Sequence, residues 1–329
     1  MISIKRLKMA AFSAISLISV AGAAPAAAAD NYPSKPVKIV VGYQPGGPTD
    51  LLARIVAERL QADLGQPFVV ENKPGVASNI ASQEVARAKP DGYTLLMAAA
   101  PIATNQFMYK NVGFDVLKDF QPISQIMSAP SVLVVSKQLG FESVEDVIER
   151  GKSDSRGLTV ASTGFGGTPH LASEFFIQRT GIKTVHVPYK GQSSAVTDVM
   201  AGHVDMYFIT SLSAIPYLSS GNPQPLAVLA KQRMPQLPDV PTLAETSVGE
   251  LVAESWTGLF APAGTPRPIV DKLHASMAKI IQDPAIHKEL TEQGAIVTGS
   301  ESPAAFEKFV QHNVEMWGEI LKTAQIEPL

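Results

Sequence analysis

The chain of 329 residues contains no cysteine. This absence excludes disulfide bonds, thiolate metal sites, iron–sulfur clusters, a cysteine nucleophile and a lipid-modified N-terminal cysteine. Basic residues are not in excess either, because 27 lysines and arginines stand against 30 acidic residues and give a formal net charge of −3. Since no basic cluster marks a nucleic-acid surface, we expect no nucleic-acid partner.

Long apolar runs are also missing beyond the first 29 residues. Residues 1–29 have the pattern of a secretory signal peptide: basic residues, then an uncharged run at 9–24, then the small-residue cleavage site Ala27-x-Ala29. An N-terminal membrane anchor is the alternative, but the run of about 16 residues is shorter than the roughly 20 that a spanning helix needs. We therefore predict a periplasmic protein, exported with cleavage of residues 1–29.

Beyond residue 30, short runs of branched apolar residues alternate with stretches of helical periodicity. This alternation predicts an α/β chain with a largely parallel sheet covered on both faces. The unit occurs once before residue 130 and once after it. The expected strands are at 37–41, 68–70, 93–97, 131–135, 158–161, 184–187 and 204–209.

The C-terminal part has one expected strand, at 256–261, followed by three expected helices at 267–281, 285–293 and 303–323. One strand is too few for a third sheet, so we predict that the chain returns to complete the first lobe. Two chain crossings, near 126–130 and 250–255, would then join two lobes. The predicted units are the signal peptide 1–29, a first lobe of 30–127 plus 251–329, and a second lobe of 128–250.

Two similar glycine turns, one in each lobe, are the most informative local feature. Residues 45–50 read PGGPTD and residues 164–170 read GFGGTPH, and each stretch follows an expected strand and opens an expected helix. Adjacent glycines admit another group close to the backbone, and the free N–H groups at a helix start form a small-anion site. Either turn alone could be an ordinary tight connection, but both together favour ligand contact.

Other site patterns do not fit. Pro48 stands where a P-loop needs lysine, and Pro169 occupies the third glycine position of a dinucleotide fingerprint. His170 and Glu174 share a helix face, but no further ligand at a readable spacing completes a metal site. We expect no metal, no cofactor and no catalytic group. Asp205 opens a strand, where contact with a ligand and a hydrogen bond to a neighbouring loop N–H are alternative roles.

Several short motifs follow one another in a specific order along the chain. They are VGYQPGGPTD at 41–50, VENKPG at 70–75, DGYTL at 91–95, VPYKG at 187–191, GHVD at 202–205 and LPDVPTL at 237–243. Each motif is weak alone, but the ordered set resembles the periplasmic substrate-binding receptors of tripartite tricarboxylate transporters, the Bug-type family. The resemblance implies a two-lobed periplasmic-binding-protein fold of the Venus-flytrap, type II-like kind. It also implies a small carboxylate ligand and delivery to membrane transporter subunits.

The resemblance also implies a ligand site, held largely by backbone groups and ordered waters of the two glycine turns. Carried over by position, the contacts in the first lobe are Tyr43, Gly46, Gly47, Thr49, Asp50, Ala100, Thr104 and Asn105. Those in the second lobe are Thr163, Gly166, Gly167, Thr168 and His170, followed further along the chain by Asp205 and Phe208. Neither turn contains an arginine, so we expect no bidentate arginine clamp. Phe165 replaces a polar residue that is common in the family, and we hypothesise that it favours an aromatic or longer-chain acid.

The sequence therefore predicts a monomeric receptor that is not an enzyme. A receptor that serves another transporter or a signalling kinase is an alternative, because it would bind its ligand in the same way. An enzyme of the same bilobal fold is a further alternative, and it would need a positioned base or nucleophile between the lobes.

Overall fold

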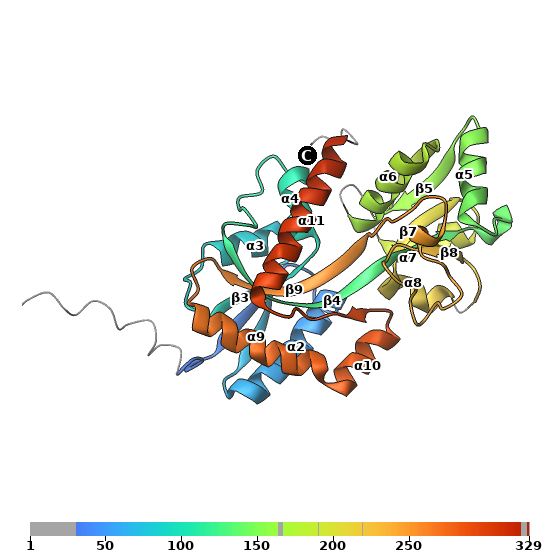
Figure 1. Ribbon diagram of the computed structural model, residues 1–329. Helices are drawn as coiled ribbons and strands as arrows, with labels where there is room; N and C mark the ends of the chain where they lie inside the picture. Colours follow the sequence, from blue (N-terminus) through green and yellow to red (C-terminus); the bar gives the residue numbers. More distant parts are fainter. Residues whose placement is uncertain (1–30, 164–166, 190, 219, 324–327, 329) are drawn as a thin grey trace, which may run out of the picture.

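The computed structural model describes residues 31–163, 167–189, 191–218, 220–323 and 328. The signal peptide predicted at residues 1–29 lies outside the described residues, so its cleavage stays a prediction. Figure 1 shows two lobes side by side, joined by long strands. Helices pack on the sheet of each lobe, as expected for an α/β chain.

The first lobe is built on a sheet that is parallel at its edge. Its parallel strands are β1 (Val37–Val41), β2 (Phe68–Asn72) and β3 (Thr94–Ala99), with β1 between the other two. The chain returns to this lobe as β9 (Glu254–Pro262), which pairs antiparallel with β3. The C-terminal part therefore joins the first sheet, as predicted, while the exact lobe boundaries stay a prediction.

Two hydrophobic cores lie on opposite faces of this sheet. One core lies under α2 (Pro48–Leu64), α9 (Arg267–Gln282) and α10 (Pro284–Glu292). The other lies under α3 (Asn79–Ala86), α4 (Pro101–Met108) and α11 (Pro303–Thr323). Helices α9 and α11 carry apolar residues every three or four positions, so each buries one face and leaves the other in water.

The second lobe repeats the arrangement. Its sheet contains the parallel strands β5 (Leu158–Ser162), β6 (Thr184–Pro188) and β7 (Met206–Thr210), and also β8 (Gln224–Val228). One core lies under α5 (Val144–Ser153) and α6 (Thr168–Thr180), and the other under α7 (Gln192–Met200) and α8 (Ser211–Leu218). The end of α11 also packs into the core under α6 through Trp317 and Leu321, so this helix touches both lobes.

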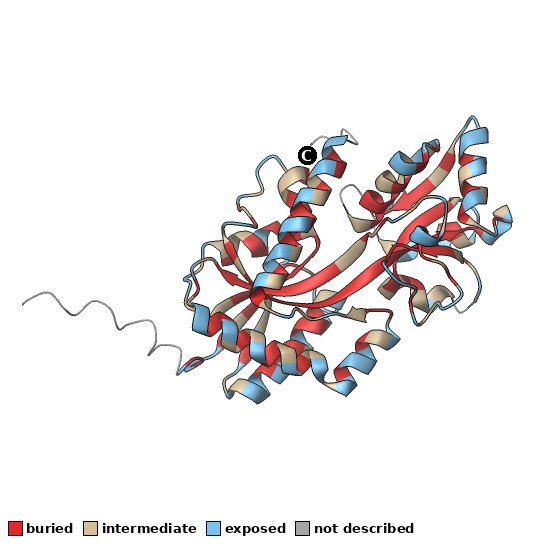
Figure 2. Ribbon diagram, viewed as in Figure 1, coloured by how far each residue is buried: buried red, intermediate tan, exposed pale blue. Residues whose placement is uncertain are grey.

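One long strand, β4 (Phe120–Val135), passes through both lobes. Its residues 120–130 pair with β9 and its residues 131–135 pair with β7 and β8. The short strand β10 (Ile296–Val297) pairs with β4 at Met127 and Ser128. Within the described residues the strand order is β2-β1-β3-β9-β4-β7-β5-β6, a single continuous sheet. Figure 2 shows that β4 and β9 are buried along most of their length where they cross between lobes.

The remaining elements of the described residues are three short 3-10 helices. They are η1 (Val76–Ser78), η2 (Lys137–Leu139) and η3 (Leu243–Glu245). Among the described helices, none combines the length and the apolar character needed to cross a bilayer.

Candidate ligand-binding site

The first glycine turn lies between the end of β1 and the start of α2, as the sequence predicts. Gly46 has a φ of +81°, in the left-handed region that favours glycine. Gly47 is the extended N-cap and Pro48 is the first helical residue. Because N–H groups in the first turn of a helix have no acceptor within the helix, the amides of Thr49 and Asp50 lie at its positive end.

The carboxylate of Asp50 organises this turn. Its Oδ2 accepts hydrogen bonds from the backbone N of Gly46 at 2.8 Å and from Nε of Arg54 at 3.0 Å, and its Oδ1 accepts one from Nδ2 of Asn72 at 2.8 Å. Burial raises the pKa of Asp50, but the hydrogen bonds from Arg54, Gly46 and Asn72 outweigh it and hold the pKa at about 2. Asp50 is 1% exposed, and with this pKa its carboxyl group is ionised at pH 7. It therefore shapes the turn, which offers fewer free N–H groups than the sequence suggests.

Asn72, at the end of β2, connects two parts of the same turn. Its Nδ2 donates to the backbone O of Tyr43 at 3.1 Å as well as to Asp50. Tyr43 is half-buried against the core of the first lobe, and burial raises the pKa of its hydroxyl above the usual range. Sequence reasoning missed the role of Asn72, because nothing in the local pattern shows that two strand ends meet here.

The residues predicted after β3 lie at the start of α4. The backbone N of Ala100 donates to the O of Trp256 at 2.9 Å, which anchors the end of β3 to β9. Thr104 is buried, and its Oγ1 lies 3.4 Å from the O of Pro101. Asn105 is buried too, and its Nδ2 donates to the O of Ala77 at 2.8 Å and to Oδ1 of Asn79 at 2.6 Å.

The segment that Asn105 holds is conformationally unusual. Ala77 and Ser78 have φ values of +51° and +75°, which residues other than glycine rarely adopt. The Oγ of Ser78 is buried and has no hydrogen-bond partner among the described residues. A Cβ placed on Gly42 would lie 1.9 Å from this oxygen. The start of α3 therefore packs directly against the end of β1, and backbone strain of this kind is typical of ligand sites.

The second glycine turn falls partly outside the described residues, because 164–166 are not among them. The predictions for Gly166 and Phe165 therefore stay untested. On either side, Thr163 follows the end of β5, and Gly167 is the extended N-cap of α6 with Thr168 and Pro169 next. The start of α6 thus repeats the start of α2: an extended glycine cap followed by a proline in the first turn.

His170 lies below this turn in a cluster of polar side chains. Its ring centroid is 4.7 Å from that of His186, whose Nε2 is 2.5 Å from Oγ of Ser162. The Nε2 of His170 is 3.7 Å from Oε1 of Glu174. Burial, with a smaller contribution from His186, lowers the pKa of His170 to about 4, so the ring is neutral at pH 7. The side chain is buried within the second lobe, beside His186 and Glu174.

The structure does not bring Asp205 to the second glycine turn, and it buries the side chain of Phe208 in the core under α6. Asp205 precedes β7, and its Oδ2 accepts hydrogen bonds from N and Oγ1 of Thr159 at 2.7 and 2.8 Å. Thr159 lies near the start of β5, so this pair is at the amino ends of parallel strands, whereas the turn is at the carboxyl ends. Phe208 is 0% exposed and packs against Phe176 at 5.4 Å between ring centroids. Of the two roles left open for Asp205, the hydrogen bond to a neighbouring N–H is the one observed.

Within the part of the chain that the structure describes, no group of three or more histidine, aspartate or glutamate side chains is arranged to hold a metal ion. The described candidate residues therefore comprise two helix starts, one on each lobe, with Asp50 and Asn105 hydrogen-bonded to nearby loop backbone and His170 buried near the start of α6. Such helix starts bind small anions through backbone N–H groups.

Solved structures with this architecture are those of periplasmic binding proteins. The chain superposes on R. palustris Rpa4515 with adipate at a TM-score of 0.79 and 36% identity, over 91% of this chain and 100% of that one. For MatC from Rhodopseudomonas palustris with bound malate, the TM-score is 0.73 and the identity 29%, over 88% and 100% of the two chains. The fold class is therefore the predicted one, a two-lobed periplasmic-binding-protein fold.

Sequence comparison gives the family. Residues 52–326 match the Tripartite tricarboxylate transporter family receptor. Protein BugT of Bordetella pertussis is 33% identical over 297 residues, which are 90% of this chain and 91% of that protein. The chain belongs to the tripartite tricarboxylate transporter receptor family, and the resemblance deduced from the ordered motifs is confirmed. Members of this family are periplasmic solute receptors for carboxylates.

Proposed function

We propose that this chain is a periplasmic receptor that binds a small organic carboxylate between its lobes and delivers it to the membrane subunits of a tripartite tricarboxylate transporter. The observation that carries the proposal is the pair of glycine-capped helix starts, one after β1 and one after β5. Adipate and malate in the two solved relatives support a dicarboxylate of about four to six carbons as the first ligand class to test.

In the proposed site, backbone amides bind the carboxylate oxygens. The first lobe supplies the amides of Thr49 and Asp50, and the second supplies those of Gly167 and Thr168. An anion at a helix start gains about 0.3–2 kcal/mol from the helix dipole, so two such ends and bridging waters give useful affinity without a charged side chain. The other proposed contacts are Tyr43, Gly46, Gly47, Ala100, Thr104, Thr163 and Gly166.

Asp50, Asn105 and His170 have a different proposed role. Each is buried and interacts with other protein groups. An ionised Asp50 would also repel a carboxylate that approached it directly, because like charges in contact are unfavourable. We therefore assign these three side chains to loop support.

The first experiment is a thermal-shift screen of residues 30–329 against adipate, malate, longer diacids, tricarboxylates and aromatic acids. A ligand at 100 times its Kd stabilises the fold by about 2.7 kcal/mol, which raises the Tm by a few degrees at this size. The diamide of each active diacid is the control and should give no shift. A flat screen, with no acid found in denatured protein by mass spectrometry, would contradict the proposal.

A matched pair of glycine variants tests the site itself. Gly46 and Gly65 lie at opposite ends of α2, both with positive φ and with nothing within 4 Å of an added Cβ. Gly46→Ala and Gly65→Ala should therefore lower stability by similar amounts, about 1 kcal/mol. Only Gly46→Ala should weaken binding of the acid found in the screen, measured by calorimetry. Equal affinities for the two variants would show that the first turn does not contact the ligand.

The absence of catalysis and the choice of transporter need separate tests. Any acid that stabilises the protein should be recovered unchanged after long incubation, as expected for a receptor that is not an enzyme. Binding to reconstituted membrane subunits of a tripartite transporter, dependent on the acid, would support delivery. Capture by a sensor kinase or another transporter instead would favour the alternative partner.

A further inference from the structure

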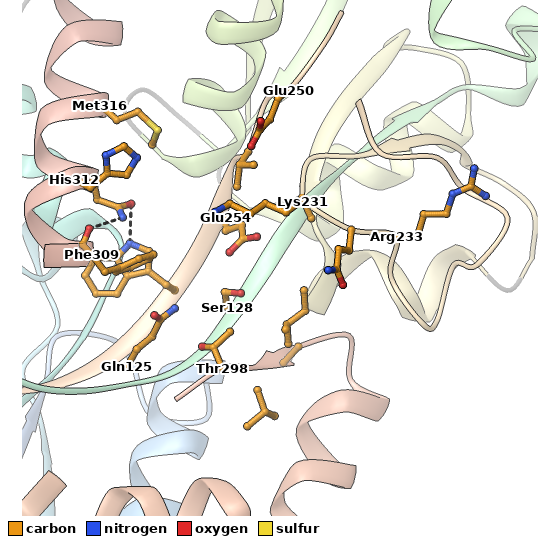
Figure 3. A pocket seen from close by; sticks show the side chains of 18 of the residues that line it. Gln125, Ser128, Lys231, Arg233, Glu250, Glu254, Thr298, Phe309, His312 and Met316 are labelled. Atoms are coloured by element: carbon orange, nitrogen blue, oxygen red, sulfur yellow. Dashed lines mark hydrogen bonds between the residues drawn. The ribbon is translucent and has the colours of Figure 1, made fainter. Parts of the chain in front are cut away.

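A cavity of about 1010 Å³ lies against the two crossing strands, and no described residue predicted for the ligand site lines it. Figure 3 shows Gln125 and Ser128 of β4 and Glu254 of β9 beside it, with Lys231 next to Glu254 and His312 of α11 at the left. The first lobe contributes α10, β10 and α11, and the second contributes α6 and residues 230–236. Because the walls belong to different lobes, the cavity changes shape whenever the angle between the lobes changes.

Two hydrogen bonds join the lobes beside this cavity. The Nε2 of Gln236 donates to the backbone O of Thr291 at 2.6 Å, and both residues line the cavity. The Oγ of Ser211 donates to the backbone O of Gly294 at 2.6 Å, in a buried position. Gln236 and Ser211 belong to the second lobe, while residues 291–294 form the end of α10 and the connection to β10. We name residues 291–294 the α10 latch.

The contact at Gly294 is closely fitted. This glycine has a φ of +91°, and an added Cβ would lie 2.8 Å from Cγ1 of Ile215 and 3.0 Å from the O of Ser211. Leu212, the next residue of α8, packs against the core of the first lobe. The start of α8 therefore fits against the latch through a side-chain hydrogen bond and apolar packing, with glycine allowing the approach.

We propose that the α10 latch holds the lobes in the arrangement described and so sets the fraction of molecules that can close on a ligand. Among residues 43–50 and 167–169 no hydrogen bond joins the two glycine turns, whereas the latch makes both of the hydrogen bonds above. We take the arrangement described as the open one, so that rotation about β4 and β9 toward closure of the turns would have to shift the latch contacts. Their free energy therefore opposes closure and lowers the apparent affinity. The expected effect on ligand affinity rests on the proposed function, whereas the expected effect on the arrangement of the lobes does not.

The test uses the absence of native cysteine. Cysteines placed at Glu58 in α2 and Glu149 in α5, both exposed, carry spin labels on the two lobes. Double electron–electron resonance spectroscopy then gives the distance between the two labels, and so between the lobes, without ligand. Gln236→Ala should increase the ratio of closed to open molecules about fivefold, the change that corresponds to one hydrogen bond of about 1 kcal/mol. The control Gln232→Ala removes a glutamine that also lines the cavity and should leave the ratio unchanged.

Ser211→Ala is an independent second variant and should act in the same direction. Both variants should also tighten binding of the acid from the screen about fivefold, with Gln232→Ala at the native value. Unchanged distances in both variants, or weaker binding, would overturn the latch. If the distances shift but no acid binds, the latch stands and the proposed ligand class fails. If an acid binds but neither variant changes distance or affinity, the latch fails and the proposed function stands.

Discussion

Replacing Asp50 by asparagine removes the charge around which the first glycine turn is organised. Donors approach both carboxylate oxygens: Oδ2 faces the N–H of Gly46 and Nε of Arg54, and Oδ1 faces Nδ2 of Asn72. An asparagine must place its own NH₂ group on one of these sides. Whichever side it takes, a donor then faces a donor in a site that is buried.

The magnitude follows from the pKa and from the lost hydrogen bonds. A fall of the Asp50 pKa from 3.8 to about 2 on folding corresponds to about 2.5 kcal/mol of stability at pH 7. An unsatisfied buried donor alone costs about 1–3 kcal/mol, which is consistent with this figure. The folded-state pKa is the lower one, so the stabilisation is present above pH 4 and is lost as the pH falls through 2.

Urea denaturation of the native chain and Asp50→Asn at pH 7 and at pH 3 measures this contribution. We expect Asp50→Asn to be about 2–3 kcal/mol less stable at pH 7, with a smaller difference at pH 3. Asp271→Asn is the matched control, because Asp271 forms the same kind of pair with Arg267, four residues away, on the surface. It should cost about 0.5 kcal/mol or less. Similar losses in the two variants, or a difference independent of pH, would refute the account of the turn.

Three further predictions concern the loops around the site. Asn105→Ala leaves the O of Ala77 and Oδ1 of Asn79 without their donor and should cost about 1–3 kcal/mol in urea denaturation. Gly42→Ala should cost about 1–3 kcal/mol because of the clash with Ser78, and adding Ser78→Gly should restore part of it in a double-mutant cycle. His170 has a folded-state pKa of about 4 against 6.5 unfolded, so the unfolded chain binds more protons between these values. Stability should therefore fall as the pH drops from 6.5 to 4, and His170→Phe should remove that part of the slope in a series of denaturation curves.

Much of the fold is local and could be predicted from the sequence. The helix expected at 303–323 is α11 with the same bounds, because its apolar spacing is regular and Pro303 suits a helix start. Only the end of β4 was expected, at 131–135. Its residues 120–130 include buried polar side chains such as Ser124 and Ser128, which a search for apolar runs passes over. Helix α8 and strand β8 were not predicted either. Helix α8 contains Pro216, and a proline inside a segment predicts the end of a helix.

In the candidate site, too, the local patterns could be predicted and the long-range contacts could not. The strand–glycine–helix order of both turns is a local pattern, and the start of α2 confirms it. The partners of the polar side chains are not local. Asp50 meets Asn72 across 22 residues, and Asp205 meets Thr159 across 46. Which strand ends are neighbours depends on the strand order, so no spacing rule could separate a ligand contact from a structural hydrogen bond at these positions.

We do not expect the polar side chains near the turns to set ligand choice. Near the turns, the side chains of Asp50 and Asn105 hydrogen-bond to loop backbone, and His170 lies beside His186 and Glu174. Substituting any of them changes loop geometry and stability together, so a loss of binding there would not identify a contact. Backbone amides bind the carboxylate group but do not discriminate between acids that differ elsewhere. Selectivity should therefore come from residues that shape the space beyond the amides, and Phe165 in the second turn is the residue to exchange first. If Phe165→Asn leaves the ranking of aliphatic and aromatic acids unchanged while stability is kept, the second turn does not set ligand choice.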